Sequence, residues 1–219
     1  MKKTALVIGA TGLVGHYLVG QLLTDARFER VKVFTRRPTG YHNPDKLEEH
    51  IVDFDKPSEW QELLQGEVLF SALGTTLKQA GSKDDQYRVD HTYQLQTAEH
   101  AARNGTDTYV LVSAAGADKD SALFYNRMKG ELERDVQALA FARVRILQPG
   151  VLAGPREQAR PLERFGIGAA ALLGQLPGLH KYRPIHARTV ARAMINASFD
   201  EEVGVQVDTL DGVFKRAGE

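Results

Sequence analysis

Tyr125 and Lys129 are the residues whose types and spacing offer the clearest chemistry in this chain. A separation of four residues places both side chains on one face of a helix, which we predict over about 122–139. A free phenol has a pKa near 10, and an adjacent ammonium group can lower that pKa by about one to three pH units. A tyrosine tuned in this way exchanges protons closer to neutral pH. The same spacing also arises by chance, so the pair gains meaning only from the elements around it.

Ser113 ends an apolar segment, 108–113, that predicts a buried strand twelve residues before Tyr125. The sequence around Ser113 lacks the Gly-x-Ser-x-Gly pattern, which argues against a hydrolase nucleophile. The chain has no cysteine, which excludes disulfides, thiolate metal sites and cysteine nucleophiles. The histidines form no pair at a spacing of three or four, so we expect no metal site; they stand at positions 16, 42, 50, 91, 100, 180 and 186.

A glycine-rich turn near the start of the chain predicts a dinucleotide site. Apolar residues 5–8 predict a buried strand that stops at Gly9, and a helix is predicted over 13–24. Gly9 makes the turn, Gly12 lets a pyrophosphate approach the backbone, and Gly15 lets helix and strand pack closely. A secretory signal after Lys2 is the alternative, but the glycines and the missing cleavage site disfavour it. The cofactor contacts expected here are Gly9, Thr11, Gly12, Leu13, Val14 and Gly15.

The end of the second predicted strand, 31–35, favours NADP(H) over NAD(H). NAD sites usually place an acidic residue here to hold the adenosine ribose, whereas NADP sites place arginine for the 2′-phosphate. This chain has Arg36 and Arg37, and no acidic residue between positions 31 and 38. The alternative is a solvated basic strand end. We therefore expect NADP(H), with both arginines in the site.

The remaining pattern predicts an α/β fold, namely a single-domain, doubly wound Rossmann-type fold with a mostly parallel sheet. A third strand and its exit are predicted over 50–55, a helix over 57–64, a strand over 67–71 and a helix over 87–104. Further strands are predicted over 143–147 and 203–210. Two groups of strand-end residues are expected near the cofactor, Asp53 with Phe54 beside the adenine, and Ala72, Leu73 and Gly74 across the sheet. A helix cap or a plain turn is the alternative for each group.

Composition excludes several classes of protein. The 219 residues carry 28 Lys and Arg against 28 Asp and Glu, so no charge excess favours nucleic acid or an anionic membrane. The longest apolar stretch, about 165–176, is too short to span a bilayer. The absence of cysteine leads us to expect a cytoplasmic location. We expect one domain over 1–219, with 152–185 as a substrate-covering segment.

Taken together, the motifs resemble the short-chain dehydrogenase/reductase superfamily, in its atypical or extended branch. They are Gly9-x-x-Gly12-x-x-Gly15, Ser113-Ala-Ala-Gly and Tyr125-x-x-x-Lys129. Four segments look most similar to the Tat-interactive-protein oxidoreductases, namely residues 73–76, 89–93, 113–118 and 149–152. The resemblance covers about residues 1–190.

This resemblance implies roles for individual residues. Tyr125 would be the catalytic acid/base, and Lys129 would hold the nicotinamide ribose and lower the pKa of the tyrosine. Ser113 would bind the substrate carbonyl, and Pro149 would lie at the cofactor. His186 is expected to be structural.

Two departures from the superfamily pattern accompany the resemblance. Asp90 stands where an asparagine is common, which puts the usual proton relay in doubt, and Gln148 stands where the extended branch commonly has arginine. The leading expectation is an NADPH-dependent oxidoreductase that reduces a small carbonyl substrate, as a monomer or a homodimer. The alternative is an NADPH-binding regulatory or interaction protein with little or no activity, which Asp90 also fits. An epimerase or dehydratase using bound NAD is disfavoured by Arg36 and Arg37.

Overall fold

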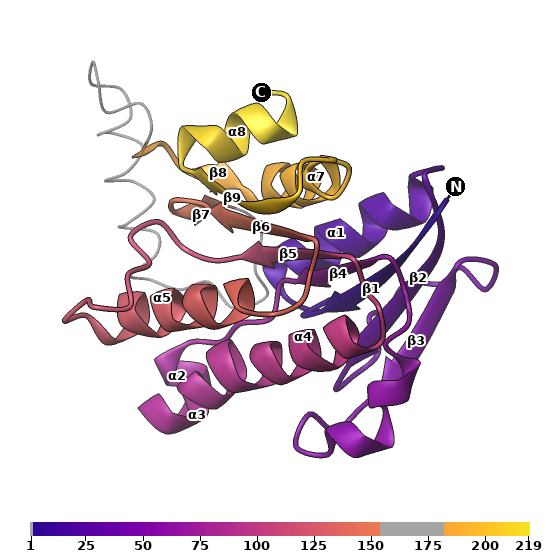
Figure 1. Ribbon diagram of the computed structural model, residues 1–219, viewed down its shortest axis with the longest axis horizontal. Coiled ribbons are helices and arrows are strands. Elements are labelled where there is room, and N and C mark those ends of the chain that lie inside the picture. The colour runs from indigo at the N-terminus through magenta and orange to yellow at the C-terminus, as the bar shows by residue number, and fades with distance from the viewer. Residues whose placement is uncertain (1, 154–181) are drawn as a thin grey trace.

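Seven strands form one sheet in the order β3-β2-β1-β4-β5-β6-β9, and all neighbouring strands run parallel (Figure 1). The structure is a computed structural model that describes residues 2–153 and 182–219. The strands are β1 Lys3–Ile8, β2 Phe28–Thr35, β3 Leu47–Ile51, β4 Val68–Ser71, β5 Thr108–Val112, β6 Arg143–Gln148 and β9 Gly204–Thr209. The order reverses between β1 and β4, as in dinucleotide-binding folds. The expected doubly wound Rossmann-type fold is confirmed.

Helices cover both faces of the sheet, with α1, α7 and α8 on one face and α4 and α5 on the other (Figure 1). The longer helices are α1 Leu13–Thr24, α4 Tyr93–Arg103, α5 Phe124–Gln137, α7 Ala187–Ala197 and α8 Asp211–Ala217. Two short helices, α2 Leu77–Ala80 and α3 Lys83–Tyr87, precede α4. Strand β1 shows why the sequence folds this way. Ala5 and Val7 are buried under α1, and Leu6 and Ile8 under α4 and α5, so the strand is apolar on both faces.

Three elements differ from the sequence expectations. Strand β3 ends at Ile51, so Asp53 and Phe54 lie in the loop that follows it. Two 3₁₀ turns, Pro57–Glu59 and Gln61–Leu63, replace the helix predicted over 57–64. The buried Trp60 separates them, and its indole N–H donates to the Asp53 carbonyl oxygen (2.9 Å). The helix predicted over 87–104 contains a π-helical turn, Arg88–Thr92, before α4 begins.

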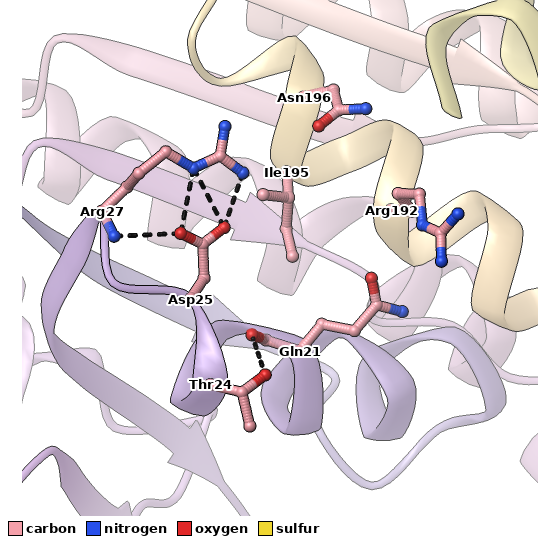
Figure 2. Close-up of a pocket in the computed structure, with 7 residues that line it drawn as sticks. All are labelled: Gln21, Thr24, Asp25, Arg27, Arg192, Ile195 and Asn196. Atoms are coloured by element: carbon pink, nitrogen blue, oxygen red, sulfur yellow. Dashed lines mark hydrogen bonds and ion pairs between the residues drawn. The ribbon is translucent and has the colours of Figure 1, made fainter. Parts of the chain in front are cut away.

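A groove lies between the last turn of α1 and α7 (Figure 2). Its lining residues are Gln21, Thr24, Asp25, Arg27, Arg192, Ile195 and Asn196. The carboxylate of Asp25 holds Arg27 through two guanidinium nitrogens and its backbone N–H. The groove is at the opposite end of α1 from the glycine turn, and none of the expected site residues lines it.

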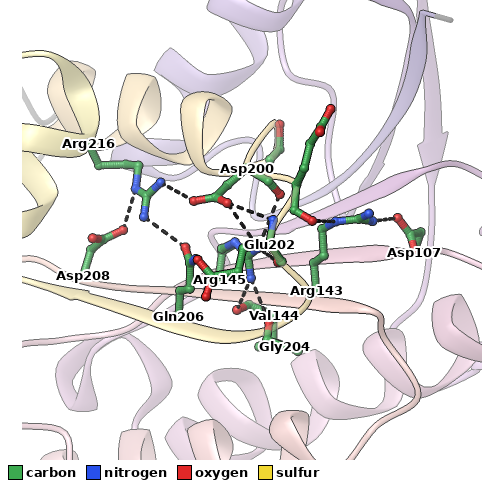
Figure 3. Close-up of polar contacts among 12 residues, drawn as sticks. Asp107, Arg143, Val144, Arg145, Asp200, Glu202, Gly204, Gln206, Asp208 and Arg216 are labelled. Carbon is green, nitrogen blue, oxygen red and sulfur yellow. Dashed lines mark hydrogen bonds and ion pairs between the residues drawn. The ribbon is translucent and has the colours of Figure 1, made fainter.

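A buried arginine fixes the connection between α7 and the edge strand β9. The Arg145 guanidinium is fully buried and donates to the carbonyl oxygens of Gly204 (2.7 Å), Asp200 (3.3 Å) and Glu202 (Figure 3). Arg216 of α8 joins this network by pairing with the carboxylate of Asp200 (2.8 Å). The cluster satisfies backbone acceptors in the bend before β9, and we therefore assign it a structural role.

We expect Arg145→Met to lower the free energy of unfolding by about 2–5 kcal/mol, because it removes the buried charge that donates to several partly buried carbonyl oxygens. Urea unfolding followed by circular dichroism measures this loss. Arg143→Met is the control, since Arg143 lies two positions earlier on β6 in a partly exposed pair with Asp107 and should lose less than about 1 kcal/mol. Equal losses in the two variants would contradict a special role for Arg145.

Candidate active site

The glycine turn after β1 needs two of its glycines for steric reasons. Gly9 has a φ of 81°, a conformation that favours glycine, and a Cβ there would lie 2.3 Å from the carbonyl carbon of Ala72. A Cβ on Gly15 would lie 2.1 Å from the carbonyl oxygen of Gly9. The turn is thus packed against the loop after β4 on one side and against the first turn of α1 on the other.

Gly12 is the N-cap of α1, and no side chain caps this helix. The N–H groups of the first helical turn therefore lack the side-chain acceptor that usually satisfies one of them. A Cβ on Gly12 would lie 3.2 Å from the carbonyl oxygen of Gly9 and 3.8 Å from that of Ala72. Uncapped amides, the positive end of the helix dipole and an open approach at Gly12 together fit a pyrophosphate group. Thr11 belongs to this turn, and Leu13 and Val14 are the first residues of α1 after it.

Arg36 and Arg37 lie beside this turn. Ile8 at the end of β1 pairs with Phe34 near the end of β2, so the two strands end beside each other at the same edge of the sheet. Both arginines directly follow β2. Both are exposed, and neither guanidinium forms an ion pair or hydrogen bond with the described part of the chain. The Thr35 hydroxyl donates to the carbonyl oxygen of Arg37 (2.9 Å), which holds the bend. Both cations are available to an anionic ligand.

The loop after β3 presents the two residues expected at the adenine in different ways. The Phe54 ring is buried, stacked on Tyr93 (5.5 Å between centroids) and packed against Trp60. Only its backbone could meet an adenine. Asp53 is exposed, and its carboxylate accepts the backbone N–H of Asp55 (3.0 Å).

Ser113, Tyr125 and Lys129 meet at the same edge of the sheet, where β5 ends and α5 begins. Ser113 follows β5 directly, and its backbone N–H donates to the carbonyl oxygen of Leu147 (2.8 Å). The Ser113 hydroxyl is buried and makes no hydrogen bond of ordinary geometry within the described residues. Tyr125 lies in the first turn of α5 and is 42 % exposed, whereas Lys129 one turn later is 3 % exposed. The phenol faces solvent above a buried ammonium group.

Asp90 is the ion-pair partner of Lys129. Its Oδ1 lies 3.2 Å from the Lys129 Nζ, and its Oδ2 accepts the backbone N–H of Thr75 (2.7 Å). Burial alone lowers the pKa of Lys129, but the charges of Asp90, Tyr125 and Glu133 more than offset this effect, and the net pKa is raised. The sequence marked Asp90 only as a departure, because nothing in the spacing shows that it meets Lys129.

Glu133 is a site residue that the sequence analysis missed. It follows Lys129 by four residues, so the +4 spacing could have placed it on the same face of α5. Both of its carboxylate oxygens accept the Gln148 side-chain amide (3.0 Å each). Burial raises the pKa of Glu133. The polar side chains of Ser113 and Gln148 and the positive charge of Lys129 lower this pKa, but they offset only part of the rise. Gln148 therefore pairs with a carboxylate at the position where an arginine is common.

Gly130 is a second residue that sequence reasoning overlooked. A Cβ there would lie 2.1 Å from the backbone nitrogen of Lys119, so the loop after β5 rests directly on α5. A glycine inside a helix costs about 1 kcal/mol relative to alanine, which signals a packing requirement. This contact sets the position of α5 relative to the loop that begins at Ser113.

The other expected residues lie at the same edge. Ala72, Leu73 and Gly74 follow β4, and the carbonyl oxygen of Pro149 after β6 accepts the backbone N–H of Ala115 (3.0 Å). The expected covering segment, 152–185, lies outside the described residues except at its ends. There β7 Leu152–Ala153 pairs with β8 Ile185–His186. His186 caps α7 through its Nδ1, which accepts the backbone N–H of Arg188 (3.1 Å).

Residues 2–153 and 182–219 contain neither a candidate metal site nor a candidate membrane span. These residues contain no group of three His, Asp or Glu side chains placed to hold a metal ion. No helix among them combines the length and the apolar character needed to cross a bilayer.

A protein-family model described as NAD(P)H-binding matches residues 9–153, which run from the glycine turn to β7. The chain therefore belongs to this NAD(P)H-binding family, which is the class of domain that the sequence motifs resemble. A nicotinamide dinucleotide is thus the class of cofactor that this domain binds.

The chain is also similar, over most of its length, to curated fungal proteins. It is 37 % identical over 203 residues to "Protein fmp52-1, mitochondrial" of Aspergillus oryzae, covering 90 % of this chain and 86 % of that one. It is 43 % identical over 173 residues to "Protein FMP52, mitochondrial" of Saccharomyces cerevisiae, covering 77 % and 74 %. Their names state no activity.

These names correct one expectation. The relatives are named mitochondrial proteins, so the expected cytoplasmic location is wrong. The reason is that a chain without thiols is compatible with oxidising and reducing compartments alike. Its lack of cysteine therefore does not indicate a cellular location.

Among solved structures, a short-chain dehydrogenase/reductase superfamily protein from Agrobacterium tumefaciens with bound NAD has a TM-score of 0.70. The two chains are 17 % identical, and the match covers 94 % of this chain and 77 % of that one. At this identity the likeness establishes the fold.

Proposed function

We propose that this protein is an NADPH-dependent oxidoreductase that reduces a small carbonyl substrate. The observation that carries the proposal is the arrangement on α5, where the exposed phenol of Tyr125 stands one turn from the buried ammonium group of Lys129. Ser113 ends the adjacent strand with a hydroxyl that has no ordinary hydrogen bond in the described structure. All three lie at the carboxyl edge of the sheet, where dinucleotides bind in this class of fold.

Each residue then has a defined task. Tyr125 gives its phenolic proton to the carbonyl oxygen, and the neighbouring positive charge of Lys129 stabilises the phenolate that remains. Lys129 also donates to the ribose hydroxyls of the cofactor, and the Ser113 hydroxyl donates to the carbonyl oxygen and orients it. The bound nicotinamide supplies the hydride.

The preference for NADPH is supported by Arg36 and Arg37, two exposed cations beside the glycine turn. We expect Arg36→Ala to weaken NADPH binding about 10- to 100-fold, because a charge-assisted hydrogen bond to the 2′-phosphate is worth about 1.5–3 kcal/mol. NADH binding should change much less. Fluorescence titration of both cofactors at one salt concentration measures the difference. Arg30→Ala removes a charge from the amino end of the same strand and serves as the control. Equal affinities of the unmutated protein for NADH and NADPH would rule out this preference.

A turnover panel tests the proposed function. The unmutated protein is incubated with NADPH and a set of aldehydes, ketones and quinones, and NADPH consumption is followed by absorbance. We expect at least one carbonyl compound to be reduced. Tight NADPH binding with no consumption across the panel would favour the alternative, a regulatory or interaction protein that binds NADPH without using it.

A further inference from the structure

Asp90 lies at the centre of a buried cluster that links three elements. It is 2 % exposed and belongs to the π-helical turn Arg88–Thr92. One carboxylate oxygen contacts the Lys129 ammonium group (3.2 Å), and the other accepts the backbone N–H of Thr75 (2.7 Å). A single carboxylate thus connects α5 to the loop after β4.

The backbone of Asp90 is also fixed from the sheet. Its carbonyl oxygen accepts the side-chain amide of Gln94 (2.7 Å), and the Gln94 oxygen accepts the hydroxyl of Ser71 at the end of β4 (2.6 Å). Gln94 is fully buried. The π turn changes which residues of this helical segment face the sheet, and such turns are frequent at functional sites. Here it coincides with a carboxylate that faces Lys129.

Stability alone is a weak reason to keep this ion pair. Replacing a buried pair by apolar residues of similar size is often neutral or stabilising, because the desolvation of two charges offsets their attraction. The pair does give Lys129 a fixed charge and direction. Three titratable groups face the ammonium group, namely Asp90 from the π turn and Tyr125 and Glu133 from α5, and together they raise the pKa of Lys129 despite its burial.

Oδ2 of Asp90 connects Lys129 to the cofactor side of the site through the loop after β4. The loop held by the Thr75 N–H includes Gly74, where a Cβ would lie 3.2 Å from the Asp90 carboxylate. Leu73 and Ala72 precede it and pack against Gly9 of the nucleotide turn. A movement of Asp90 would therefore displace Lys129 and this loop together.

We propose that Asp90 is the positioning residue for Lys129, holding its ammonium group charged and aimed at the cofactor ribose and Tyr125 while anchoring the loop after β4. This inference rests on the proposed function for the cofactor contact. The ion pair itself is testable without cofactor or substrate.

The first test follows the Lys129 side chain by NMR in protein labelled with ¹³C-lysine, with the signal assigned by its loss in Lys129→Arg. We expect the Lys129 amine in the unmutated protein to stay protonated to higher pH than an exposed lysine. In Asp90→Asn it should lose its proton at lower pH than in the unmutated protein. Asp90→Glu, which keeps the charge, should restore much of the unmutated profile. Asp135→Asn is the control, because Asp135 pairs with His91 of the same π turn (2.9 Å) without facing Lys129.

The second test measures the dissociation constant for NADPH between pH 7 and pH 9. It should stay nearly constant for the unmutated protein and rise about tenfold for Asp90→Asn, since a charge-assisted hydrogen bond is lost when the amine is neutral. An unchanged Lys129 titration in Asp90→Asn would overturn the proposal. If that variant does not fold, an unmutated Lys129 that titrates at or below the pH of an exposed lysine overturns it equally. Shifted titration without any carbonyl turnover would reject only the proposed function.

Discussion

We expect Tyr125→Phe to lower the rate of carbonyl reduction by about 10²- to 10⁴-fold, the usual contribution of a general acid. The affinity for NADPH should be unchanged, because the hydroxyl acts on the reacting carbonyl and its loss affects the transition state alone. The Tyr125 hydroxyl makes no hydrogen bond with another described residue and its side chain is partly exposed, which supports this separation. Turnover with a substrate from the panel and fluorescence titration of NADPH give the two numbers.

Two comparison variants sharpen this test. Tyr87→Phe removes a hydroxyl from α3 but keeps the ring that stacks on His91 (4.5 Å between centroids), and it should keep most of the activity. Lys129→Ala should weaken both turnover and NADPH binding, because the ammonium group acts on the phenol and on the ribose. Full activity in Tyr125→Phe would reject the assigned acid.

The second large effect is expected for Gly12→Val, which should weaken NADPH binding by more than about 100-fold, because several charge-assisted contacts to the pyrophosphate are lost together. The chain should remain folded, since Gly12 has a φ of −81° that valine can adopt, and a poorer N-cap costs about 1 kcal/mol. Thermal unfolding and NADPH titration measure the two effects. Gly212→Val places the same side chain in the first turn of α8, where a Cβ has only ordinary contacts, and should bind NADPH normally. Near-native binding by Gly12→Val would place the nucleotide elsewhere.

The sequence predicted the fold well where local patterns carry the information. The apolar run of β1, the glycine turn and the strand-helix alternation define a parallel sheet whose strands are buried on both faces, and the structure has this sheet. The prediction was less accurate where tertiary contacts decide. A buried Trp60 divides the segment after Pro57 into two 3₁₀ turns, and the π turn around Asp90 interrupts a pattern that reads as one helix.

The same division holds for the candidate site. Tyr125, Lys129 and Ser113 could be found because spacing and strand ends place them together. The partner of Lys129 could not, because Asp90 and Lys129 are 39 positions apart in the sequence and meet only after α5 packs beside the π turn. Glu133 carried a usable signal in its +4 spacing from Lys129, whereas the loop contact of Gly130 could be anticipated only as an unexplained helix glycine.

Hydride transfer is the central step of the proposed reaction, and isotope transfer tests it most directly. NADPH carrying deuterium at C4 of the nicotinamide, prepared separately for each face of the ring, is incubated with the protein and a carbonyl substrate from the panel. The substrate for this test is an aldehyde or ketone, because the transferred deuterium then stays on carbon and does not exchange with water. Mass spectrometry analyses the alcohol product. We expect deuterium in the product from one of the two preparations only, and no product from Tyr125→Phe in the same time. NADPH that binds without being consumed, or a product that carries no deuterium from either preparation, would contradict a hydride-transferring oxidoreductase.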